Sequence, residues 1–490
     1  MLPYQSLIVI EPNINVPIYR QIAGKLVALI QSGKIIPGAY LPGTREMAAI
    51  TKVHRNTVIN AYNELVFQGW AEAIPKKGYQ IISELPVLKP RSYHPEVNFS
   101  NAPGADDIYF DRSLEHYYPG ALSTVPKIII NDGFPDIDTV PFEEIMREYR
   151  NIMRAGTLKH MMSEHYDGGT PNLKNSACHF LNQTRGLHIS PENIMITKGA
   201  QMAIYLASAI LLKPGDHVVT CDPNYFMADE IFRRKGAIIH RVPEEHEGMD
   251  IQQLEDILKR VPVKLLYIIP HHHHPTTVTM SANRRMQLLN LVEKYQLWII
   301  EDDYDYDFHY QNSPILPLAS ADHSGRIIYV GSFTKLLGPS FRMGYLIGGK
   351  ALIKQANSYM RLIDLRGDSI MECALASLID NGELSRHINR AKKLYSKRCD
   401  DAATLISNKL THALAFHKPQ GGMALWLKFK PEFPLNQVMD KAVQQGLYLA
   451  GSAYFQAEYK EVNGIRFGFA SLTEAELTQA VDILEKIVRR

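Results

Sequence analysis

Cysteine is scarce in this 490-residue chain, and the few that occur are far apart and form no Cys-x-x-Cys pair: Cys178, Cys221, Cys373 and Cys399. This argues against a disulfide framework and against a zinc site made of cysteines, so we expect ordinary buried thiols. Long apolar runs are also missing, since none approaches the ~20 residues of a membrane-spanning helix. The N-terminus lacks the positive region that opens a signal peptide. The sequence therefore predicts a cytoplasmic protein with no membrane partner.

The chain as a whole also lacks an excess of one charge, because its net charge is +2. Residues 1–90 nevertheless hold nine Lys/Arg and five Asp/Glu, a surplus of +4, whereas the remainder has 44 against 46, or −2. The composition, 46% hydrophobic and 21% charged, is typical of a globular protein. Because one domain usually holds ~100–200 residues, we expect two or more domains, of which the N-terminal one binds an anion.

Residues 1–82 show a pattern of three helices followed by two short strands. The first helix starts at Pro17 and ends at Gly33, and its apolar residues recur at three- and four-residue intervals. "TREMAAIT" predicts a short second helix with Thr44 as its N-cap, and "RNTVINAYNELVFQGW" predicts a third that stops at Gly69. "AEAI" and "YQII", separated by the basic turn "PKKG", are typical of a hairpin. This order predicts a helix-turn-helix followed by a basic wing.

Polar and basic side chains lie at the starts of the second and third predicted helices and on the hairpin turn. Guanidinium, amide and hydroxyl groups at such positions can reach the phosphates and base edges of DNA. The candidate DNA contacts are Arg45, Arg55, Asn56, Thr57, Lys76 and Lys77. Charge alone leaves an alternative, which is a small three-helix domain with a solvated basic face.

Three segments, "PIYRQIAGKL", "GKIIPGAYLPGTREMA" and "HRNTVINAYNELVFQGW", resemble the GntR-type winged helix-turn-helix nearly end to end over residues 17–82. The resemblance implies that the partner is operator DNA and that Arg45 and residues 55–57 contact it. The wing departs from the family, because "KKGY" replaces the more usual small, glycine-rich turn. That departure leaves the wing contacts of Lys76 and Lys77 with less support.

Residues 83–130 contain six prolines and no sustained periodicity, which predicts a tether. Their aromatic stretch "YFDRSLEHYYPG" suggests that part of the tether docks on a domain. The predicted organisation is therefore a DNA-binding domain at residues 1–82, a linker at 83–130 and a large domain at 131–490.

The large domain alternates helix-length periodic segments with short apolar runs. These runs are "DHVVTCD", "AIIHRVP", "KLLYIIP", "LWIIEDD", "RIIYVGS" and "MGYLIGG". The alternation predicts an α/β domain with a mostly parallel sheet. In such sheets the functional residues collect at the carboxyl ends of the strands, so the polar residues that follow these runs should meet in one crevice.

The side chains at these strand ends suit pyridoxal 5′-phosphate (PLP). Its aldehyde forms a Schiff base with a lysine, and a carboxylate that faces its pyridine nitrogen keeps the ring an electron sink. "GSFTKLLGPSFRMGY" supplies Lys335 for the Schiff base, and "IIEDDYDYDF" supplies Asp302 for the nitrogen. Tyr304 would then hydrogen-bond the ring hydroxyl, and Tyr225 in "CDPNYF" would stack on the ring face.

Five further residues suit the phosphate group of PLP. Ser332 offers a hydroxyl and Arg342 a cation. A strand turns into a helix at Gly199, so Gly199, Ala200 and Gln201 lie where helix N-terminal amides bind phosphate. Each piece alone has a simpler explanation, since a lone lysine is usually a surface residue and "EDD" after a strand can be a solvated turn or a magnesium site. The order and spacing of all these residues together favour a PLP site over the simpler explanations.

With these residues in place, the large domain resembles the aspartate-aminotransferase-like, fold-type I enzymes. "NDGFPDIDTVPFEEIMREYR", "HYDGGTPNLKNSACHFLNQTRGL" and "IRFGFASLTEAEL" extend the match, and with the N-terminal domain the chain resembles the MocR subfamily of GntR regulators from Pro17 onward. The resemblance implies that Arg466 clamps a substrate-like carboxylate, with a surface strand arginine as the alternative. It also implies a head-to-tail homodimer in which each DNA-binding domain rests on the other subunit, and an operator with two half-sites.

Four consecutive histidines, residues 271–274, follow one of the predicted strands. Consecutive residues of an extended segment alternate direction, so at most two of these imidazoles could share one metal ion without a turn, and we assign no metal site. An expression tag is also a poor explanation for an internal run directly after a strand. By the family resemblance, His274 precedes Pro275 where the enzymes' asparagine touches the ring hydroxyl, which makes His274 a candidate cofactor contact. Thr277 stands in place of the family's glycine.

The sequence thus leads to the hypothesis of a DNA-binding transcription regulator that senses PLP or an amino compound through an aldimine on Lys335. Effector binding would shift the domain arrangement and with it the affinity for DNA, and any transamination would be residual. The second interpretation is a true PLP-dependent aminotransferase with an accessory DNA-binding domain. A third, a DNA-binding module with a cofactor-free large domain, conflicts with the intact set of Lys335, Asp302, Tyr304 and Arg342.

Overall fold

The computed structural model describes most of the chain, namely residues 2–11, 16–84, 126–156, 166–310, 315–321, 324–450 and 462–489. The chain divides into two compact units, Met1–Asp111 and Arg112–Arg490, which are described separately below. Most of the predicted linker lies outside the described residues, and the domain boundaries at residues 82 and 130 stay a prediction.

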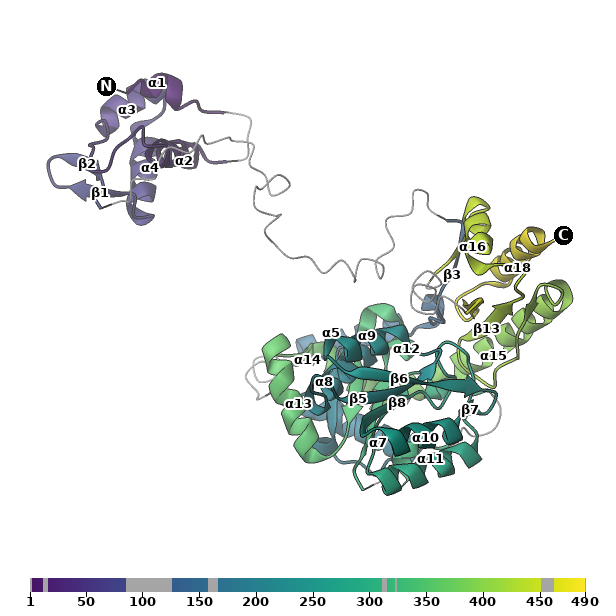
Figure 1. The fold of residues 1–490 in the computed structure, drawn as a ribbon. Helices are drawn as coiled ribbons and strands as arrows, with labels where there is room; N and C mark the ends of the chain where they lie inside the picture. The colour runs from purple at the N-terminus through teal and green to yellow at the C-terminus, as the bar shows by residue number, and fades with distance from the viewer. Residues whose placement is uncertain are drawn as a thin grey trace. The chain divides into compact units, whose positions relative to one another are not determined.

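The N-terminal unit consists of helices and one hairpin around a small apolar core (Figure 1). Its elements are α1 (Tyr4–Leu7), α2 (Ile18–Gln31), α3 (Thr44–Thr51), α4 (Arg55–Phe67), β1 (Ala71–Ile74) and β2 (Gly78–Ile81). The strands β1 and β2 pair antiparallel. Ile22 and Leu26 of α2 are fully buried against Val58, Tyr62 and Leu65 of α4, because apolar residues spaced by three and four share one helix face. The expected winged helix-turn-helix architecture is confirmed.

The expected capping role of Thr44 is wrong. Gly43 occupies the cap position in an extended conformation, α3 already begins at Thr44, and no side chain caps this helix. The Thr44 hydroxyl instead accepts a hydrogen bond from Nε of Arg55, at 3.1 Å. Sequence spacing could not separate these alternatives, because a glycine can reach the cap conformation as readily as a threonine.

The C-terminal unit is built on an eight-stranded sheet with the order β4-β11-β10-β9-β8-β5-β6-β7. Its strands are β4 (Ile194–Thr197), β5 (His217–Asp222), β6 (Ile238–Glu245), β7 (Gly248–Met249), β8 (Val263–Ile268), β9 (Trp298–Asp303), β10 (Ile327–Ser332) and β11 (Gly344–Ile347). The strands from β10 across to β6 are parallel, whereas β11 runs antiparallel to both of its neighbours and β7 runs antiparallel to β6. The six predicted apolar runs all lie in this sheet, which confirms a mostly parallel α/β fold.

Helices cover both faces of this sheet (Figure 1). One face carries α8 (Ala200–Leu211), α9 (Phe226–Arg234) and α13 (Lys350–Ile363), and the other carries α7 (Pro171–Arg185), α10 (Ile251–Arg260) and α11 (Ala282–Tyr295). Successive strand residues alternate between the two layers, so Val218 packs under α8 and α9 whereas Val219 packs under α10 and α11. The same alternation decides which polar residue at each strand end faces the site described below.

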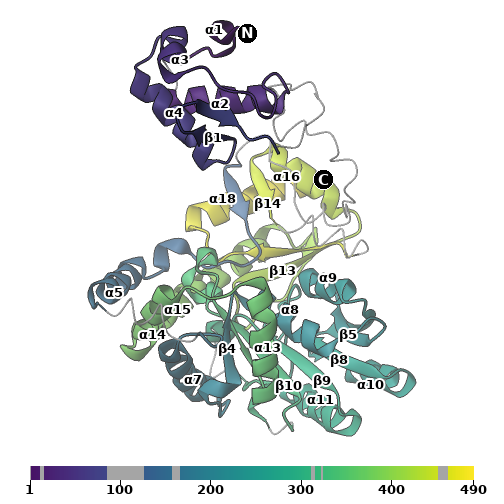
Figure 2. The same ribbon diagram turned by 90° about the vertical axis from the view of Figure 1, so that its left-hand side faces the viewer.

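Two smaller sheets and several helices complete the C-terminal unit. The sheets pair β3 (Ile128–Ile130) with β14 (Leu447–Leu449), and β13 (Ala424–Phe429) with β12 (Leu414–Ala415) and β15 (Gly464–Gly468). The helices are α5 (Phe142–Arg154), α12 (Thr334–Leu337), α14 (Ser369–Asp380), α15 (Glu383–Lys409), α16 (Leu435–Gln444) and α18 (Glu474–Val488). Figure 2 shows α16 and α18 packed beside the β3–β14 pair. Over the described ranges, no helix is both long and apolar enough to cross a membrane.

Candidate functional site

A cavity of about 230 Å³ lies where β8, β9 and β10 end. Its lining residues are Asp132, Phe134, Ala200, Gln201, Tyr225, Ile269, His274, Asp302, Tyr304, Ser332, Thr334, Lys335 and Arg342. Nine of the ten residues that the sequence suggested for a cofactor therefore line one cavity, and Gly199 directly precedes Ala200. Asp132, Phe134, Ile269 and Thr334 were not anticipated. The individual roles remain predictions, but the crevice expected at the strand ends is present.

Lys335 lies in the first turn of α12, just after β10. Its Nζ donates a hydrogen bond to the carbonyl oxygen of Gly133 at 2.9 Å and lies 4.1 Å from the centre of the Phe134 ring. Burial lowers the pKa of this amine to about 8, although the nearby Asp132 carboxylate opposes the shift. About a tenth of the amine is then uncharged at pH 7, so Lys335 can act as a nucleophile under physiological conditions.

Asp302 lines the cavity, and only one of its two carboxylate oxygens has a hydrogen-bond partner among the described residues. Its Oδ2 accepts a hydrogen bond from the hydroxyl of Tyr267 at 2.7 Å, whereas Oδ1 is buried and has no partner among the described residues. Burial raises the pKa of Asp302 to about 7. The neighbouring Asp303 points to the opposite face of the sheet, where it accepts a hydrogen bond from the hydroxyl of Tyr329. Asp302 is thus the acid available to a protonated nitrogen inside the cavity.

The N-terminus of α8 provides an anion cradle at one end of the cavity. Gly199 precedes this helix with a φ of 80°, and no side chain caps the helix. The Arg342 guanidinium lies against Gly199, because a Cβ atom at residue 199 would come within 2.9 Å of its Nη2. The hydroxyl of Ser332 accepts a hydrogen bond from the backbone N–H of Thr334 at 3.1 Å. Uncapped helix amides, a cation and a hydroxyl together suit a phosphate group.

Arg466 lies on β15, buried beside the cavity, and all its nitrogens are engaged. Its Nη1 donates to the carbonyl oxygen of Pro275 at 3.2 Å and its Nη2 to the hydroxyl of Tyr304 at 2.9 Å. Its Nε lies 3.4 Å from both the carbonyl oxygen and a carboxylate oxygen of Asp132. The Tyr304 hydroxyl in turn donates to the carbonyl oxygen of His272 at 3.0 Å. The predicted carboxylate clamp therefore already holds a carboxylate of its own chain.

Asp132 joins Arg466 to His274, whose Nε2 lies 2.8 Å from the Asp132 carboxylate. Burial alone would raise the pKa of Asp132, but the charges of His274 and Arg466 beside it outweigh burial and hold it below its ordinary value. Asp132 is not among the residues that the sequence suggested for the site. A signal was available, because Asp132 comes shortly after the apolar run Ile128–Ile130, just as Asp302 comes shortly after the apolar residues that begin its own strand.

The four histidines do not converge on one another. His274 is the one that lines the cavity, where its ring meets that of Tyr225 edge to face, with the ring centres 5.2 Å apart. The hydrogen-bond partners are Asp303 and the carbonyl of Ile315 for His271, Asp305 for His272, Thr276 for His273 and Asp132 for His274. Two of the imidazoles are thus held by the segment at the end of β9, one within the loop itself and one by Asp132, which fits a loop that packs against its surroundings.

The predicted DNA contacts lie on the N-terminal unit as expected from their helices and turn. Arg45 is exposed on α3, Arg55 and Asn56 are exposed at the start of α4, and Thr57 is half-buried behind them. Lys76 and Lys77 are exposed on the turn between β1 and β2. The ring of His54, which precedes α4, accepts a hydrogen bond from the backbone N–H of Asn56 at 3.2 Å and caps the helix. Their contacts with DNA remain predictions.

Two family models match this chain. The model for aminotransferase class I and II matches residues 130–484, and the model for bacterial regulatory proteins of the gntR family matches residues 18–81. The two matches fall on separate compact units. They agree with the winged helix-turn-helix and with the α/β fold described above.

Individual proteins resemble the whole chain or its larger part. The probable rhizopine catabolism regulatory protein MocR of Rhizobium meliloti is 27% identical over 486 residues, which covers 98% of this chain and 95% of that protein. Aromatic-amino-acid aminotransferase 1 of Thermococcus litoralis is 27% identical and covers 75% of this chain and 89% of the enzyme. A structure of Pyrococcus horikoshii kynurenine aminotransferase with PMP superposes with a TM-score of 0.70 at 26% identity, covering 79% of this chain and 96% of that one.

Proposed function

Because the chain belongs to the aminotransferase class I and II family and carries a gntR-family domain in front of it, we propose that it is a DNA-binding transcription regulator of the MocR subfamily whose large unit binds PLP through Lys335. One observation carries the proposal, namely that a winged helix-turn-helix and a cavity with a buried lysine and acid occur in one chain similar end to end to MocR. Such a chain can couple the state of the cavity to DNA binding.

PLP, when bound, supplies an aldehyde that condenses with amines and a ring that withdraws electrons. The unpartnered Oδ1 of Asp302 fits the protonated ring nitrogen, because that oxygen is buried without a partner among the described residues and its side chain belongs to a residue that lines the cavity. The α8 N-terminus with Arg342 and Ser332 would hold the phosphate. Tyr225 would pack against the ring, and Tyr304 and His274 would border its hydroxyl. Lys335 would be the covalent anchor.

The lowered pKa of Lys335 predicts how PLP capture depends on pH. Capture by cofactor-free protein requires the uncharged amine, so its rate should rise about tenfold per pH unit at low pH and level off above a pKa of about 8. Stopped-flow absorbance at a series of pH values measures this rate, with N-acetyl-lysine as the reference for changes in PLP itself. A rate that still rises at pH 9 to 10, as for a lysine with the ordinary value of 10.5, would contradict the assignment.

The contact between Asp132 and Arg466 leads to a prediction about the affinity for an effector that carries a carboxylate. If Arg466 clamps an effector carboxylate, that group must displace the Asp132 side chain from Arg466. Asp132→Asn removes the competing charge, so an α-amino acid should bind about tenfold more tightly or better, the size expected for a hydrogen bond to a charged group. The matching amine without a carboxylate should gain nothing, as calorimetric titration of both ligands can measure. Equal changes for both ligands would exclude competition at Arg466.

Coupling to DNA would follow from a shift between two arrangements of a homodimer. In the proposed regulator the aminotransferase-like units form the dimer core, head to tail, and each DNA-binding domain rests on the other subunit. An effector that reacts at Lys335 would favour one arrangement only as far as it binds that arrangement more tightly. The operator would then hold two half-sites, read in the cytoplasm by the two winged domains.

The second candidate is a true aminotransferase with an accessory DNA-binding domain, which the similarity to aromatic-amino-acid aminotransferase 1 favours. An assay of both activities on the same preparation separates the candidates. The regulator should bind DNA from near its own promoter and should show at most slow transamination with amino-acid and keto-acid pairs. Steady multiple turnover without DNA binding would establish the enzyme and overturn the regulator.

A further inference from the structure

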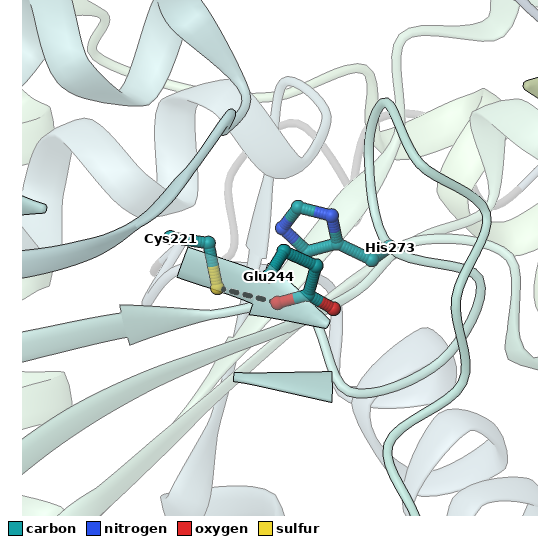
Figure 3. A group of neighbouring side chains, drawn as sticks. All are labelled: Cys221, Glu244 and His273. Carbon is teal, nitrogen blue, oxygen red and sulfur yellow. Dashed lines mark hydrogen bonds between the residues drawn. The ribbon is translucent and has the colours of Figure 1, made fainter. Parts of the chain in front are cut away.

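Three side chains of different kinds meet beside the loop that holds the four histidines, residues 271–274. They are Cys221 at the end of β5, Glu244 on β6 and His273 after β8 (Figure 3). Their ligand atoms all lie within 4.8 Å of one another, and the part of the chain that the structure describes has no other such group of three. The thiol of Cys221 donates a hydrogen bond to Oε2 of Glu244 at 3.0 Å. The cofactor cavity is not lined by any of the three.

His273 points an unused nitrogen into this group. Its side chain is fully buried, and its Nδ1 lies 2.9 Å from the hydroxyl of Thr276. Its Nε2 is buried without a partner among the described residues, and Figure 3 shows the ring above the Glu244 carboxylate. When Nδ1 carries the proton and donates it to Thr276, Nε2 keeps its lone pair. That tautomer is the one that binds metals, and an unsatisfied buried nitrogen is costly without a partner.

We propose that Cys221, Glu244 and His273 bind a Zn²⁺ ion, with water as the fourth ligand. Thiolate, imidazole and carboxylate are the ligands that zinc prefers, and the sulfur disfavours Mg²⁺ and Ca²⁺. Tetrahedral zinc with bonds of about 2.0–2.3 Å requires only a small contraction of the present group. Glu244 is half-buried, whereas the other two are buried, so the ion and the water would enter from its side.

The charges of the group balance on binding. The Cys221 thiol, which donates to Glu244 in the metal-free protein, gives up its proton to solvent when zinc binds, because the thiolate is the form that binds metals. The two positive charges of zinc then match the thiolate of Cys221 and the carboxylate of Glu244, and His273 binds as a neutral imidazole. Because binding releases a proton, the apparent affinity for zinc should rise with pH.

The site would also fix one wall of the cofactor cavity. His273 directly precedes His274, whose ring lines that cavity and contacts Asp132. A zinc ion would tie this loop to the ends of β5 and β6, in addition to the hydrogen bond with Thr276. The site is separate from PLP binding, so neither claim depends on the other.

Zinc titration of the full-length, tag-free protein, stripped with a chelator and monitored by competition with a chromophoric chelator, tests the proposal. We expect one ion per chain, and Co²⁺ in its place should give the near-ultraviolet band of thiolate coordination. Cys221→Ser and His273→Gln should each weaken zinc binding on the order of 100-fold or more. Cys178→Ser, which alters another buried thiol, and His412→Gln are the matched controls and should bind like the wild type.

Two results would overturn the site. One is a Co²⁺ complex of the unmodified protein without a thiolate band, which needs no variant to fold. The other is zinc binding by Cys221→Ser and His273→Gln that equals the wild type, with circular dichroism melts showing that both variants are folded.

Discussion

Lys335→Ala is expected to abolish the visible absorbance that the wild-type protein shows when loaded with PLP, and to let the cofactor be removed by dialysis. The physical reason is that Lys335 is the one amine that lines the cavity among the described residues, and burial keeps part of it uncharged near neutral pH. The remaining contacts, from Asp302 and the α8 N-terminus, would hold PLP only by non-covalent bonds. Absorbance spectra before and after dialysis measure both effects.

Lys354→Ala is the control for this experiment, because Lys354 is exposed on α13 and has no place in the cavity. It should leave the spectrum of the loaded protein unchanged. An unaltered band in Lys335→Ala would show that PLP attaches to another lysine, and the cavity assignment would then be wrong.

The double variant Arg45→Ala/Arg55→Ala should lose most of its affinity for operator DNA. Both side chains are exposed, one on α3 and the other at the first turn of α4, where a guanidinium can reach a phosphate or a guanine edge. Each lost contact costs about 1–3 kcal/mol, or roughly 5- to 150-fold in affinity. Fluorescence anisotropy over a range of salt concentrations measures the loss, and the salt slope should fall by ~0.9 for each phosphate contact removed.

Arg55 also donates to the Thr44 hydroxyl, so its single variant should be compared with Thr44→Val, which removes the acceptor but keeps the guanidinium. If Arg55 acts on DNA directly, Thr44→Val should weaken binding much less than Arg55→Ala does. Affinity and salt slope that stay at wild-type values in the double variant would remove both arginines from the DNA interface.

The polar residues at the ends of the parallel strands could be predicted from the sequence. Asp302 and Lys335 each follow a short apolar run, and parallel strands bring their carboxyl ends to one edge of the sheet. Because successive side chains of a strand point to opposite faces of the sheet, Asp302 faces the cavity and Asp303 faces the opposite layer of helices. These patterns involve residues that are close together in the chain, so they can be recognised in a single sequence.

Contacts between distant segments could not be predicted in the same way. The pairing of Asp132 with His274 and Arg466 joins three segments more than 100 residues apart, and no local pattern encodes it. The group of Cys221, Glu244 and His273 arises because β5, β6 and β8 are neighbours in the sheet order. The alternation rule limited to two the imidazoles that could share one ion, but it could not supply the cysteine and the acid that lie beside one of them.

The most direct test of the proposed regulator is an anisotropy titration of DNA from its own promoter region at fixed salt concentration. The wild-type protein is titrated without PLP, with PLP, and with PLP plus each of a panel of amino compounds, and Lys335→Ala is titrated in parallel. We predict that PLP or one amino compound changes the operator affinity of the wild type at least severalfold, and that Lys335→Ala does not respond. Operator affinity that is the same in every state of the wild type would contradict a regulator that senses through Lys335.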